Sequence, residues 1–398
     1  MKALLLSWEF RPNIVGGLGR AVTELADALA RQGVEVHVIT SRTGDLPERE
    51  NGQGISVFRV RPPEQDFYDI FTLADETSRR IVERVPDLLD DVGPVDFIHT
   101  HDWHLARAAI ALKHQLKVPL VATIHATEYG RHRGHIYSDL SRSINGLEWE
   151  LTYDAWRVIC CSQFMAGEVQ TAFSCPADKI VVIPNGIDPS PFNALRWLNL
   201  RRFRAAYARA DEQIILCVGR VVYEKGAHVL VEAFPRILAE YPLAKLVVTG
   251  DGPNLPAVRE RASQLGVADR CYFTGFVPID VRNRLFMVAD VAVFPSLYEP
   301  FGIVALEAMA ADAPVVVSNV GGLAEVVEHA ETGILVHPND PASLAWGVLH
   351  TLLHPEWAKM RAANAYRAAV SQYSWANIAR QTIDVYEQVI ADRERAAW

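Results

Sequence analysis

Short runs of hydrophobic residues alternate with longer stretches in which apolar and polar positions repeat at helical spacing. In the first half of the chain, the hydrophobic runs are Ala3–Leu6, Val34–Ile39, Val95–His99, Val118–Ile124 and Val158–Cys161. A helical pattern over Leu18–Arg31 follows the first of them. Hydrophobic runs without alternation are typical of parallel strands that helices cover on both faces. We therefore predict a doubly wound α/β domain in this half.

The same alternation begins again after residue 185. The hydrophobic runs of the second half are Ile214–Val218, Leu246–Thr249, Val291–Phe294 and Pro314–Val317. Helical patterns lie between them, at Ala227–Glu240, Leu255–Leu265 and Ile279–Val288. Two successive series of strands and helices predict two Rossmann-like domains, which we expect to face a central cleft.

A cluster of turn-forming residues at Ile183–Pro189 separates the two series. We place an N-terminal, acceptor-binding domain at residues 1–184 and a C-terminal, nucleotide-sugar-binding domain at residues 185–375. The last segment, Tyr373–Arg395, has a long amphipathic helical pattern. We expect its helix, within residues 376–398, to cross back and pack on the N-terminal domain.

Composition narrows the range of functions. The chain has 39 Lys and Arg against 48 Asp and Glu, a net charge of −9, which disfavours general nucleic-acid binding. The 5 cysteines form no CxxC pair, and their odd number does not indicate a disulfide framework. The first residues contain only a short apolar run, and no window is apolar enough for a membrane span. We therefore expect a cytoplasmic protein without integral membrane association.

Two glycine-containing turns follow predicted strands and could hold an anion. Val15–Arg20 opens a helix after the first strand, and its glycines let backbone amides approach a ligand. Its spacing differs from the dinucleotide fingerprint, and a tight turn without a ligand explains it equally well. In the second half, Arg220 and Lys225 follow the strand at Ile214–Val218. They fit a diphosphate clamp, with a solvated loop carrying two cations as the alternative.

Histidines and an aspartate gather where two buried strands of the first half end. His99, His101 and His104 suggest a metal site, but alternation along a strand would separate them. Asp102 is either a ligand-binding residue or the N-cap of the helix that follows. His125, at the end of the next strand, could bind a sugar hydroxyl, transfer a proton or be a structural histidine.

Two glutamates in the second half are spaced so that both can face one ligand. Glu299 lies in a loop after a strand, and Glu307 lies just over two helical turns later, on a helix that begins near Gly302. The amides around Phe301–Val304 would form an anion-binding helix N-terminus. Paired carboxylates are typical of glycoside hydrolases, but the adjacent anion site favours recognition of nucleotide-sugar hydroxyls. Ordinary helix-surface charges are the alternative.

Together these motifs resemble those of the family-4 retaining glycosyltransferases, which have the GT-B fold. The most specific match is the pair of glutamates eight positions apart, Glu299 and Glu307, within Pro295–Met309. Further matches are Gly219-Arg220, Glu224-Lys225-Gly226, Gly250-Asp251-Gly252-Pro253 and Gly321-Gly322-Leu323. The resemblance covers essentially the whole chain. Within the family, the chain is most similar to the short bacterial and archaeal glycogen synthases.

The resemblance implies a role in donor binding for each matching residue. Arg220 and Lys225 should bind the diphosphate of the nucleotide-sugar donor, and Glu299 should contact hydroxyls of its sugar. Glu307 should bind the ribose, and His125 should lie close to the transferred sugar. The expected catalytic residues are thus His125, Arg220, Lys225 and Glu299. The other donor contacts that the resemblance implies come from Gly17, near the distal phosphate, and from Phe301, Gly302, Ile303 and Val304.

The segment His101-Asp102-Trp103-His104 resembles a segment of glucan synthases, as does Trp8-Glu9. The resemblance implies acceptor binding by Glu9, Asp102 and Trp103. Glucan synthases usually carry Lys two residues before the Gly-Gly pair, where this chain has Ile14. We expect that contact to be lost or to be provided by Arg20.

The resemblance therefore implies a retaining enzyme that moves glucose from ADP- or UDP-glucose to the non-reducing end of an α-1,4-glucan. We expect no metal and no other cofactor, since no DxD-type metal motif lies near the predicted donor residues. The alternatives are a small-molecule or lipid-linked acceptor, a sugar-nucleotide epimerase of the same fold, or a non-catalytic sugar-nucleotide-binding protein. A pyridoxal phosphate-dependent phosphorylase shares the fold type, but this chain is much shorter than that family.

Overall fold

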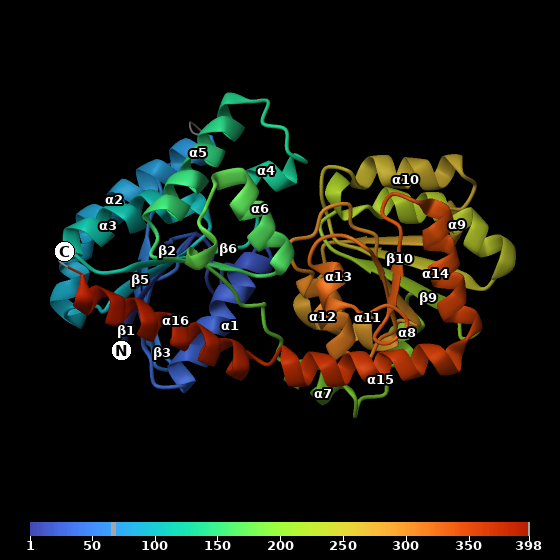
Figure 1. Cartoon of the computed structure of the whole chain (residues 1–398). Coiled ribbons are helices and arrows are strands. Elements are labelled where there is room, and N and C mark those ends of the chain that lie inside the picture. The colour runs from blue at the N-terminus through green and yellow to red at the C-terminus, as the bar shows by residue number, and fades with distance from the viewer. Residues whose placement is uncertain (65–68, 397–398) are drawn as a thin grey trace. The chain divides into compact units, whose positions relative to one another are not determined.

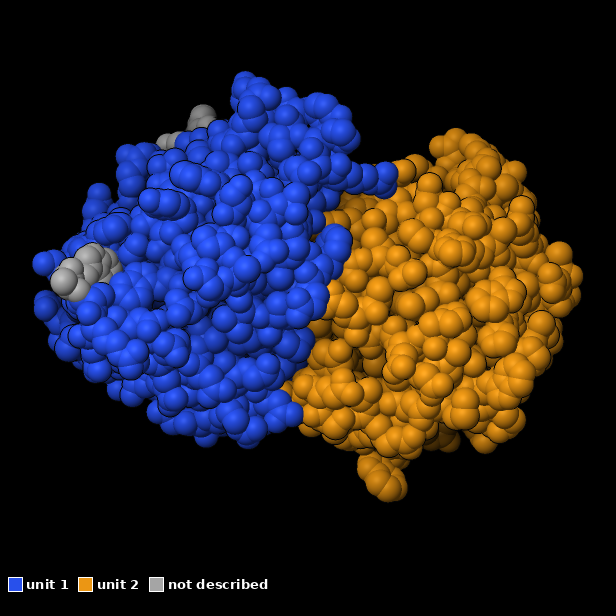
Figure 2. Space-filling view, viewed as in Figure 1, with its two compact units in different colours: residues 1–186, 375–398 blue, residues 187–374 orange. Residues whose placement is uncertain are grey.

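The computed structural model describes residues 1–64 and 69–396, which form two compact units (Figure 2). Unit 1 comprises Met1–Gly186 and Trp375–Trp398, and unit 2 comprises Ile187–Ser374. The chain thus leaves unit 1 once and returns to it. The chain passes between the units after Gly186 and again after Ser374, whereas sequence analysis placed these two boundaries after residues 184 and 375.

Unit 1 contains an eight-stranded sheet in the order β3-β4-β2-β1-β5-β6-β7-β8. Its strands are β1 Lys2–Ser7, β2 Glu35–Ser41, β3 Arg49–Gly52, β4 Ile55–Val60, β5 Phe97–His101, β6 Leu120–Ile124, β7 Arg157–Cys160 and β8 Ile180–Val182. Neighbouring strands are parallel except β3 and β4, which are antiparallel. The central strands are almost entirely buried because helices cover both of their faces.

The helices of unit 1 lie on both faces of this sheet. They are α1 Gly17–Arg31, α2 Ile70–Val92, α3 Ala106–Leu116, α4 Glu128–Arg131, α5 Asp139–Asp154, α6 Gln163–Phe173 and α16 Trp375–Arg395, with short 3-10 helices at Trp103–Leu105 and Ala177–Lys179. Helices α2, α3 and α5 pack on one face, and α1 and α16 pack together on the other (Figure 1). The C-terminal helix therefore crosses back to the N-terminal domain, as predicted.

Polar contacts near both ends of α16 bind this helix to the rest of unit 1. Gln32 Nε2, just after α1, donates to the carbonyl oxygen of Ala376 at 2.8 Å. Arg157, at the start of β7, pairs with Asp392 near the other end of α16, with 2.8 Å between Nη2 and Oδ2. Buried Ile378, Val385 and similar residues supply the apolar face that packs on the unit.

Unit 2 has a six-stranded, fully parallel sheet in the order β11-β10-β9-β12-β13-β14. Its strands are β9 Gln213–Val218, β10 Ala244–Thr249, β11 Cys271–Gly275, β12 Val291–Phe294, β13 Val315–Ser318 and β14 Ile334–Val336. Its helices are α7 Ser190–Leu195, α8 Arg201–Arg204, α9 Ala227–Glu240, α10 Leu255–Gln264, α11 Ile279–Val288, α12 Ile303–Ala310, α13 Leu323–Val326, α14 Pro341–Leu353 and α15 Pro355–Gln372, with 3-10 helices at Tyr223–Lys225 and Ala268–Arg270.

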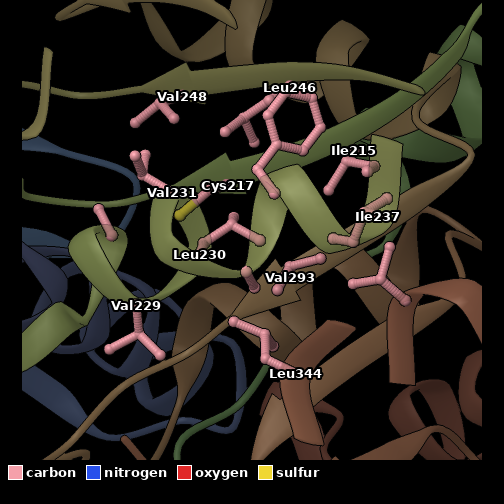
Figure 3. Close-up of a cluster of buried hydrophobic side chains, with 14 of the residues drawn as sticks. Ile215, Cys217, Val229, Leu230, Val231, Ile237, Leu246, Val248, Val293 and Leu344 are labelled. Atoms are coloured by element: carbon pink, nitrogen blue, oxygen red, sulfur yellow. The ribbon is translucent and has the colours of Figure 1, made fainter. Parts of the chain in front are cut away.

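A hydrophobic core lies between this sheet and helices α9, α10 and α14 (Figure 3). Ile215 and Cys217 of β9 lie in it with Leu246 of β10, against Leu230 of α9 and Leu344 of α14. Burial raises the pKa of the Cys217 thiol to about 12, so this cysteine acts as a small apolar residue. This core packs the helices against the sheet whose strand ends carry the loops of unit 2.

Both sheets reverse their direction of winding at the first strand of the unit. In unit 1, β1 lies between β2 and β5, and in unit 2, β9 lies between β10 and β12. Ligands of open α/β sheets bind outside the carboxyl ends of the strands at such reversals. The loops after β1, β5, β9 and β12 are therefore the candidate binding loops. Among the described helices, none is long and apolar enough to cross a membrane.

Candidate active site

The loops after β9 and β12 meet at the carboxyl edge of the unit 2 sheet. The first loop holds Arg220 and Lys225, and the second holds Glu299. Leu297 N–H donates to the carbonyl oxygen of Glu224 at 2.7 Å, which joins the two loops through the backbone. The structure thus brings together two segments that sequence analysis expected to bind one donor molecule.

A glycine permits this close approach of the two loops. A Cβ atom on Gly226 would lie 1.9 Å from the carbonyl oxygen of Pro295. Gly226 also has a φ of +71°, which is unfavourable for any residue with a side chain. Because no larger residue fits here, the sequence Lys225-Gly226 places the lysine directly against the second loop.

Lys225 and Glu299 form an ion pair in this position. Lys225 Nζ donates to Glu299 Oε2 at 2.7 Å, and Ser296 Oγ donates to the same oxygen at 3.2 Å. The two charged side chains are 27% and 16% exposed, so the pair is partly shielded from water but open to a ligand. Glu299 Oε1 makes no hydrogen bond within residues 1–64 and 69–396. This oxygen can therefore accept from hydroxyl groups of a ligand.

Arg220 differs from Lys225 in its surroundings. Its side chain is 64% exposed, and its guanidinium lies 3.9 Å from the carboxylate of Glu224. Water screens such an exposed pair, so the pair holds the guanidinium only weakly. Arg220 can reorient toward an anion, whereas Lys225 is already held in place.

The N-terminus of α12 adds backbone donors to the same edge. Gly302 precedes the helix with a φ of +103°, and Ile303 and Val304 form its first turn. First-turn N–H groups have no partner within a helix, and the helix dipole makes them attractive to anions. This places a helix N-terminus in the segment where sequence analysis expected an anion-binding one, and anion binding there stays a prediction.

A third loop, after β13, packs under this helix end. A Cβ atom on Gly322 would lie 2.4 Å from Phe301 Cα, so only glycine allows the contact. Gly322 N–H donates to the carbonyl oxygen of Glu299 at 2.9 Å. The backbone on both sides of the Glu299 carboxylate is therefore fixed by neighbouring loops.

Glu307 is more buried than its predicted contact with a ribose suggests. Its side chain is 2% exposed, and its Oε1 accepts from Arg282 Nη2 at 2.9 Å. Arg282 comes from α11, and sequence analysis did not identify it. The burial of an acid and a base together is stable only when they are paired. The role of Glu307 in ribose binding stays a prediction.

In unit 1, the glycine turn after β1 is held by a carboxylate of the chain itself. Glu9 Oε2 accepts from the N–H groups of Val15 at 2.9 Å and Gly16 at 3.1 Å. A Cβ atom on Gly19 would lie 2.7 Å from this oxygen, so the glycine makes room for the glutamate. Glu9 thus orders the turn that precedes Gly17, and its predicted contact with the acceptor remains a prediction.

The expected N-cap alternative for Asp102 is wrong. Asp102 makes no side-chain bond to the helical turn that follows it. Its Oδ1 instead accepts from the backbone N–H of His125 at 2.7 Å, and its own backbone N–H donates to the carbonyl oxygen of Thr123. Because β5 and β6 are neighbours, Asp102 ties the end of one strand to the end of the other, and it positions His125.

Three histidines gather behind this aspartate. The rings of His99 and His101 are 4.2 Å apart between centroids, and His101 Nδ1 lies 3.1 Å from His125 Nε2. Burial lowers the pKa of His99 to about 3, and burial also lowers the pKa values of His101 and His125. These rings are therefore uncharged at neutral pH. This neutral cluster contrasts with the charged residues of unit 2.

Trp103 and His104 pack beside the cluster. The ring of Trp103 is 2% exposed and stacks on His104, which in turn stacks on Trp8. Trp103 is therefore mostly covered by its neighbours, and its predicted contact with an acceptor remains a prediction. Within residues 1–64 and 69–396, no group of three or more His, Cys, Asp or Glu side chains could hold a metal ion.

The chain matches two glycosyltransferase families along its length. Residues 15–191 match Glycosyltransferase Family 4, and residues 201–368 match Glycosyl transferases group 1. An uncharacterised glycosyltransferase of Methanocaldococcus jannaschii is 42% identical, with 97% of this chain and 98% of the relative covered. The glycogen synthase of Mycobacterium tuberculosis is 36% identical, with 97% and 94% covered. A D-inositol 3-phosphate glycosyltransferase of Xylanimonas cellulosilytica is 32% identical, with 95% and 93% covered.

Solved structures share the arrangement of strands and helices. Sucrose-phosphate synthase from Thermosynechococcus elongatus superposes with a TM-score of 0.84 at 27% identity, covering 98% of this chain and 99% of that one. The catalytic domain of starch synthase IV from Arabidopsis thaliana, bound to ADP and acarbose, has a TM-score of 0.77 at 19% identity, with 98% and 99% covered. The fold is that of the GT-B glycosyltransferases.

Proposed function

This chain belongs to the family-4 glycosyltransferases, and we propose that it is a retaining enzyme that transfers glucose from ADP- or UDP-glucose to the non-reducing end of an α-1,4-glucan. The observation that carries the proposal is the Lys225–Glu299 pair beside the N-terminus of α12. The cation and the helix N-terminus suit the diphosphate of a nucleotide sugar. The carboxylate, whose Oε1 makes no hydrogen bond within the described residues, suits the sugar hydroxyls. The glucan acceptor is supported by the identity to a glycogen synthase.

The diphosphate of the donor would bind the positive side of this site. Lys225 and the first-turn amides of α12 are in place, and Arg220 can turn toward the phosphates. As the bond between the sugar C1 and the phosphate oxygen breaks, negative charge grows on the leaving diphosphate. Donors fixed beforehand at that place stabilise the transition state more than the ground state. Lys225, Arg220 and the helix end thus provide this stabilisation without a metal ion.

The donor sugar would bind the negative side. Lys225 and Ser296 hold Glu299 through Oε2, so Oε1 is oriented to accept hydrogen bonds from sugar hydroxyls. Lys225 would then contact both the diphosphate and Glu299. This arrangement couples recognition of the sugar to binding of the leaving group.

The configuration at C1 is retained because the acceptor hydroxyl attacks C1 on the same face from which the diphosphate departs. The acceptor hydroxyl forms its bond to C1, the bond from C1 to the phosphate oxygen breaks, and the hydroxyl proton passes to the leaving diphosphate. No protein nucleophile takes part in this step. The unit 1 residues Glu9, Asp102 and Trp103 would bind the acceptor, and His125 would lie near the transferred sugar.

The test is nucleotide release from ADP-glucose and from UDP-glucose, each with and without glycogen, in the presence of EDTA. We expect release that depends on glycogen, elongated α-glucan as the product, and a clear preference for one base. Release without dependence on glycogen would overturn the glucan acceptor. Loss of activity in EDTA that Mg²⁺ restores would overturn the metal-independent mechanism.

One observation favours a second acceptor class. Relatives that are D-inositol 3-phosphate glycosyltransferases also match over most of their length, so a small phosphorylated polyol is the alternative acceptor. Replacing glycogen by D-inositol 3-phosphate in the same assay distinguishes the two. Glycogen should stimulate nucleotide release, and inositol phosphate should not.

A further inference from the structure

Buried polar side chains connect the C-terminal helix to His125. His99 and His101 lie on β5, His125 follows β6, and Tyr386 lies on α16. His99 Nδ1 is 2.6 Å from the Tyr386 hydroxyl, and its Nε2 is 2.7 Å from the Thr123 hydroxyl. Both nitrogens of His99 are therefore engaged, and its ring cannot rotate without breaking a hydrogen bond.

His101 lies between this fixed ring and His125. It is 1% exposed, its ring is 4.2 Å from that of His99, and its Nδ1 is 3.1 Å from His125 Nε2. On the other side, the backbone of His125 is bound to Asp102 Oδ1 at 2.7 Å. The position of the His125 ring is thus defined by contacts of both its side chain and its backbone.

The hydrogen bond between the two rings needs one proton. Both histidines have a lowered pKa because burial disfavours the charged ring, so each carries a single N–H. Either His101 Nδ1–H donates to His125 Nε2, or His125 Nε2–H donates to His101 Nδ1. In the first arrangement, His125 carries its proton on Nδ1 and His101 Nε2 carries none. In the second arrangement, His101 carries its proton on Nε2 and His125 Nδ1 carries none.

The second nitrogen of His101 decides between them. Among the residues that the structure describes, His101 Nε2 is buried and has no hydrogen-bond partner. If it carried the proton, a buried N–H group would be left unsatisfied, which is the rarer and more costly outcome. His101 therefore carries its proton on Nδ1 and donates to His125 Nε2.

We propose that His101 is a positioning residue that fixes His125 in the Nδ1–H tautomer, so that His125 offers a hydrogen-bond donor to the transferred sugar. With Nε2 engaged as an acceptor, His125 keeps its proton on Nδ1. Such a ring can donate to an oxygen of the sugar, and it cannot remove a proton through Nε2. This inference rests on the proposed function for the identity of the ligand, but the tautomer itself does not depend on it.

The first experiment determines the tautomer in the unmodified enzyme. Protein labelled with ¹⁵N-histidine is studied by long-range proton–nitrogen correlation NMR at neutral pH, and His125 is assigned by the signals lost in His125→Ala. We expect the Nδ1–H pattern for His125 and for His101. An Nε2–H pattern for His125 would overturn the proposal, whatever the activity of the enzyme.

The second experiment removes the donor. In His101→Phe, a ring of similar size remains but donates no hydrogen bond. We expect His125 to lose its single tautomer and kcat to fall about tenfold, corresponding to one hydrogen bond, while the KM for the donor changes less. His101→Asn should recover most of kcat, because its amide nitrogen can donate from nearly the position of Nδ1.

His37→Phe is the matched control. His37 is a buried histidine on β2 of the same sheet, 4% exposed, and its ring contacts Glu35 rather than the cluster. We expect His37→Phe to leave both the His125 tautomer and kcat unchanged. If His101→Phe folds, keeps the Nδ1–H tautomer and keeps its kcat, the positioning role is wrong. If the unmodified enzyme shows the Nδ1–H tautomer but transfers no sugar to glycogen, the proposed function fails and the tautomer assignment stands.

Discussion

The two units use the same architecture to build opposite kinds of site. At the carboxyl edge of unit 2, the chain places ionised groups, with Lys225 paired to Glu299 beside a helix N-terminus. At the equivalent edge of unit 1, it places uncharged histidines, and the amides of the glycine turn are bound to Glu9. A site of fixed charges suits a diphosphate, and uncharged histidine rings that form hydrogen bonds suit sugar hydroxyls. The fold itself does not decide which ligand each sheet binds.

Among the variants that test this difference, we expect Lys225→Ala to have the largest effect. The variant removes the cation that is already positioned in unit 2, so we expect kcat/KM to fall by roughly 10²–10³. Nucleotide release under single-turnover conditions measures the loss. Lys245→Ala is the control, because Lys245 belongs to the same unit but bonds to the carbonyl oxygen of Asp269. Near-normal activity in Lys225→Ala would refute the diphosphate clamp.

Glu299→Gln tests the negative side of the same site. The amide has nearly the same shape as the carboxylate, but it has no charge and therefore accepts weaker hydrogen bonds from sugar hydroxyls. We expect activity to fall about 10- to 100-fold. Binding of the free nucleoside diphosphate, measured by calorimetry, should change much less than turnover. Equal losses in both would mean that Glu299 serves the diphosphate through Lys225 and not the sugar.

The two units should also respond differently to pH. In unit 1, burial lowers the pKa of His99 to about 3 and of His104 to about 4, so the unfolded chain binds more protons below pH 6.5. Each such histidine then reduces the stability of unit 1 by about 1.4 kcal/mol for every pH unit of acidification. Burial raises the pKa of Glu148 to about 8. Above the ordinary pKa of a glutamate, the folded protein keeps this proton while the unfolded chain loses it, so the free energy of unfolding falls as the pH rises toward 8.

We therefore expect the stability of unit 1 to be greatest near pH 6.5. Hydrogen exchange of peptides from β5 and β6, corrected for intrinsic rates, should show reduced protection at pH 5 and at pH 8. Peptides from β9 and β10 of unit 2 serve as the internal comparison. Parallel changes in both units would show that the buried histidines of unit 1 are not the cause.

The smallest expected effect concerns the glycine turn of unit 1. Gly19→Ala would place a methyl group 2.7 Å from Glu9 Oε2, so we expect a loss of about 1–3 kcal/mol in the free energy of unfolding. Gly16→Ala meets no atom within 4 Å and should be nearly neutral. Urea unfolding of the two variants measures the difference. Equal stabilities would show that Glu9 moves aside at little cost.

The central strands and several helices could be predicted from sequence, whereas the strands near the sheet edges and the long helices α2, α5 and α15 were not identified. The run at Val34–Ile39 and the helix at Ala227–Glu240 are both present, because burial on both faces or on one stripe leaves a clear pattern. Sequence analysis missed β3, β4, β8, β11 and β14. Most of these are short or partly exposed strands at or near a sheet edge, and their composition is not distinctive.

The candidate site divides in the same way. The proximity of Lys225 and Glu299 follows from two loops at adjacent strand ends, which a pattern of strands can predict. The contact of Arg282 with Glu307, and the two amides bound by Glu9, depend on side-chain directions and loop conformations. Asp102 shows the same limit, because its sequence position fits a helix cap while its carboxylate binds the next strand end.

The return of the last helix to unit 1 makes unit 2 an insertion whose two ends are adjacent. Ile187 N–H donates to the carbonyl oxygen of Tyr373 at 2.7 Å, and the backbone of Gly186 lies against the ring of Trp375. A gene that joins Gly186 to Trp375 through a few residues would therefore encode unit 1 alone, and residues 187–374 would encode unit 2 alone. For engineering, this means that a unit equivalent to unit 2 could be exchanged between related enzymes as a cassette, at two junctions that lie side by side.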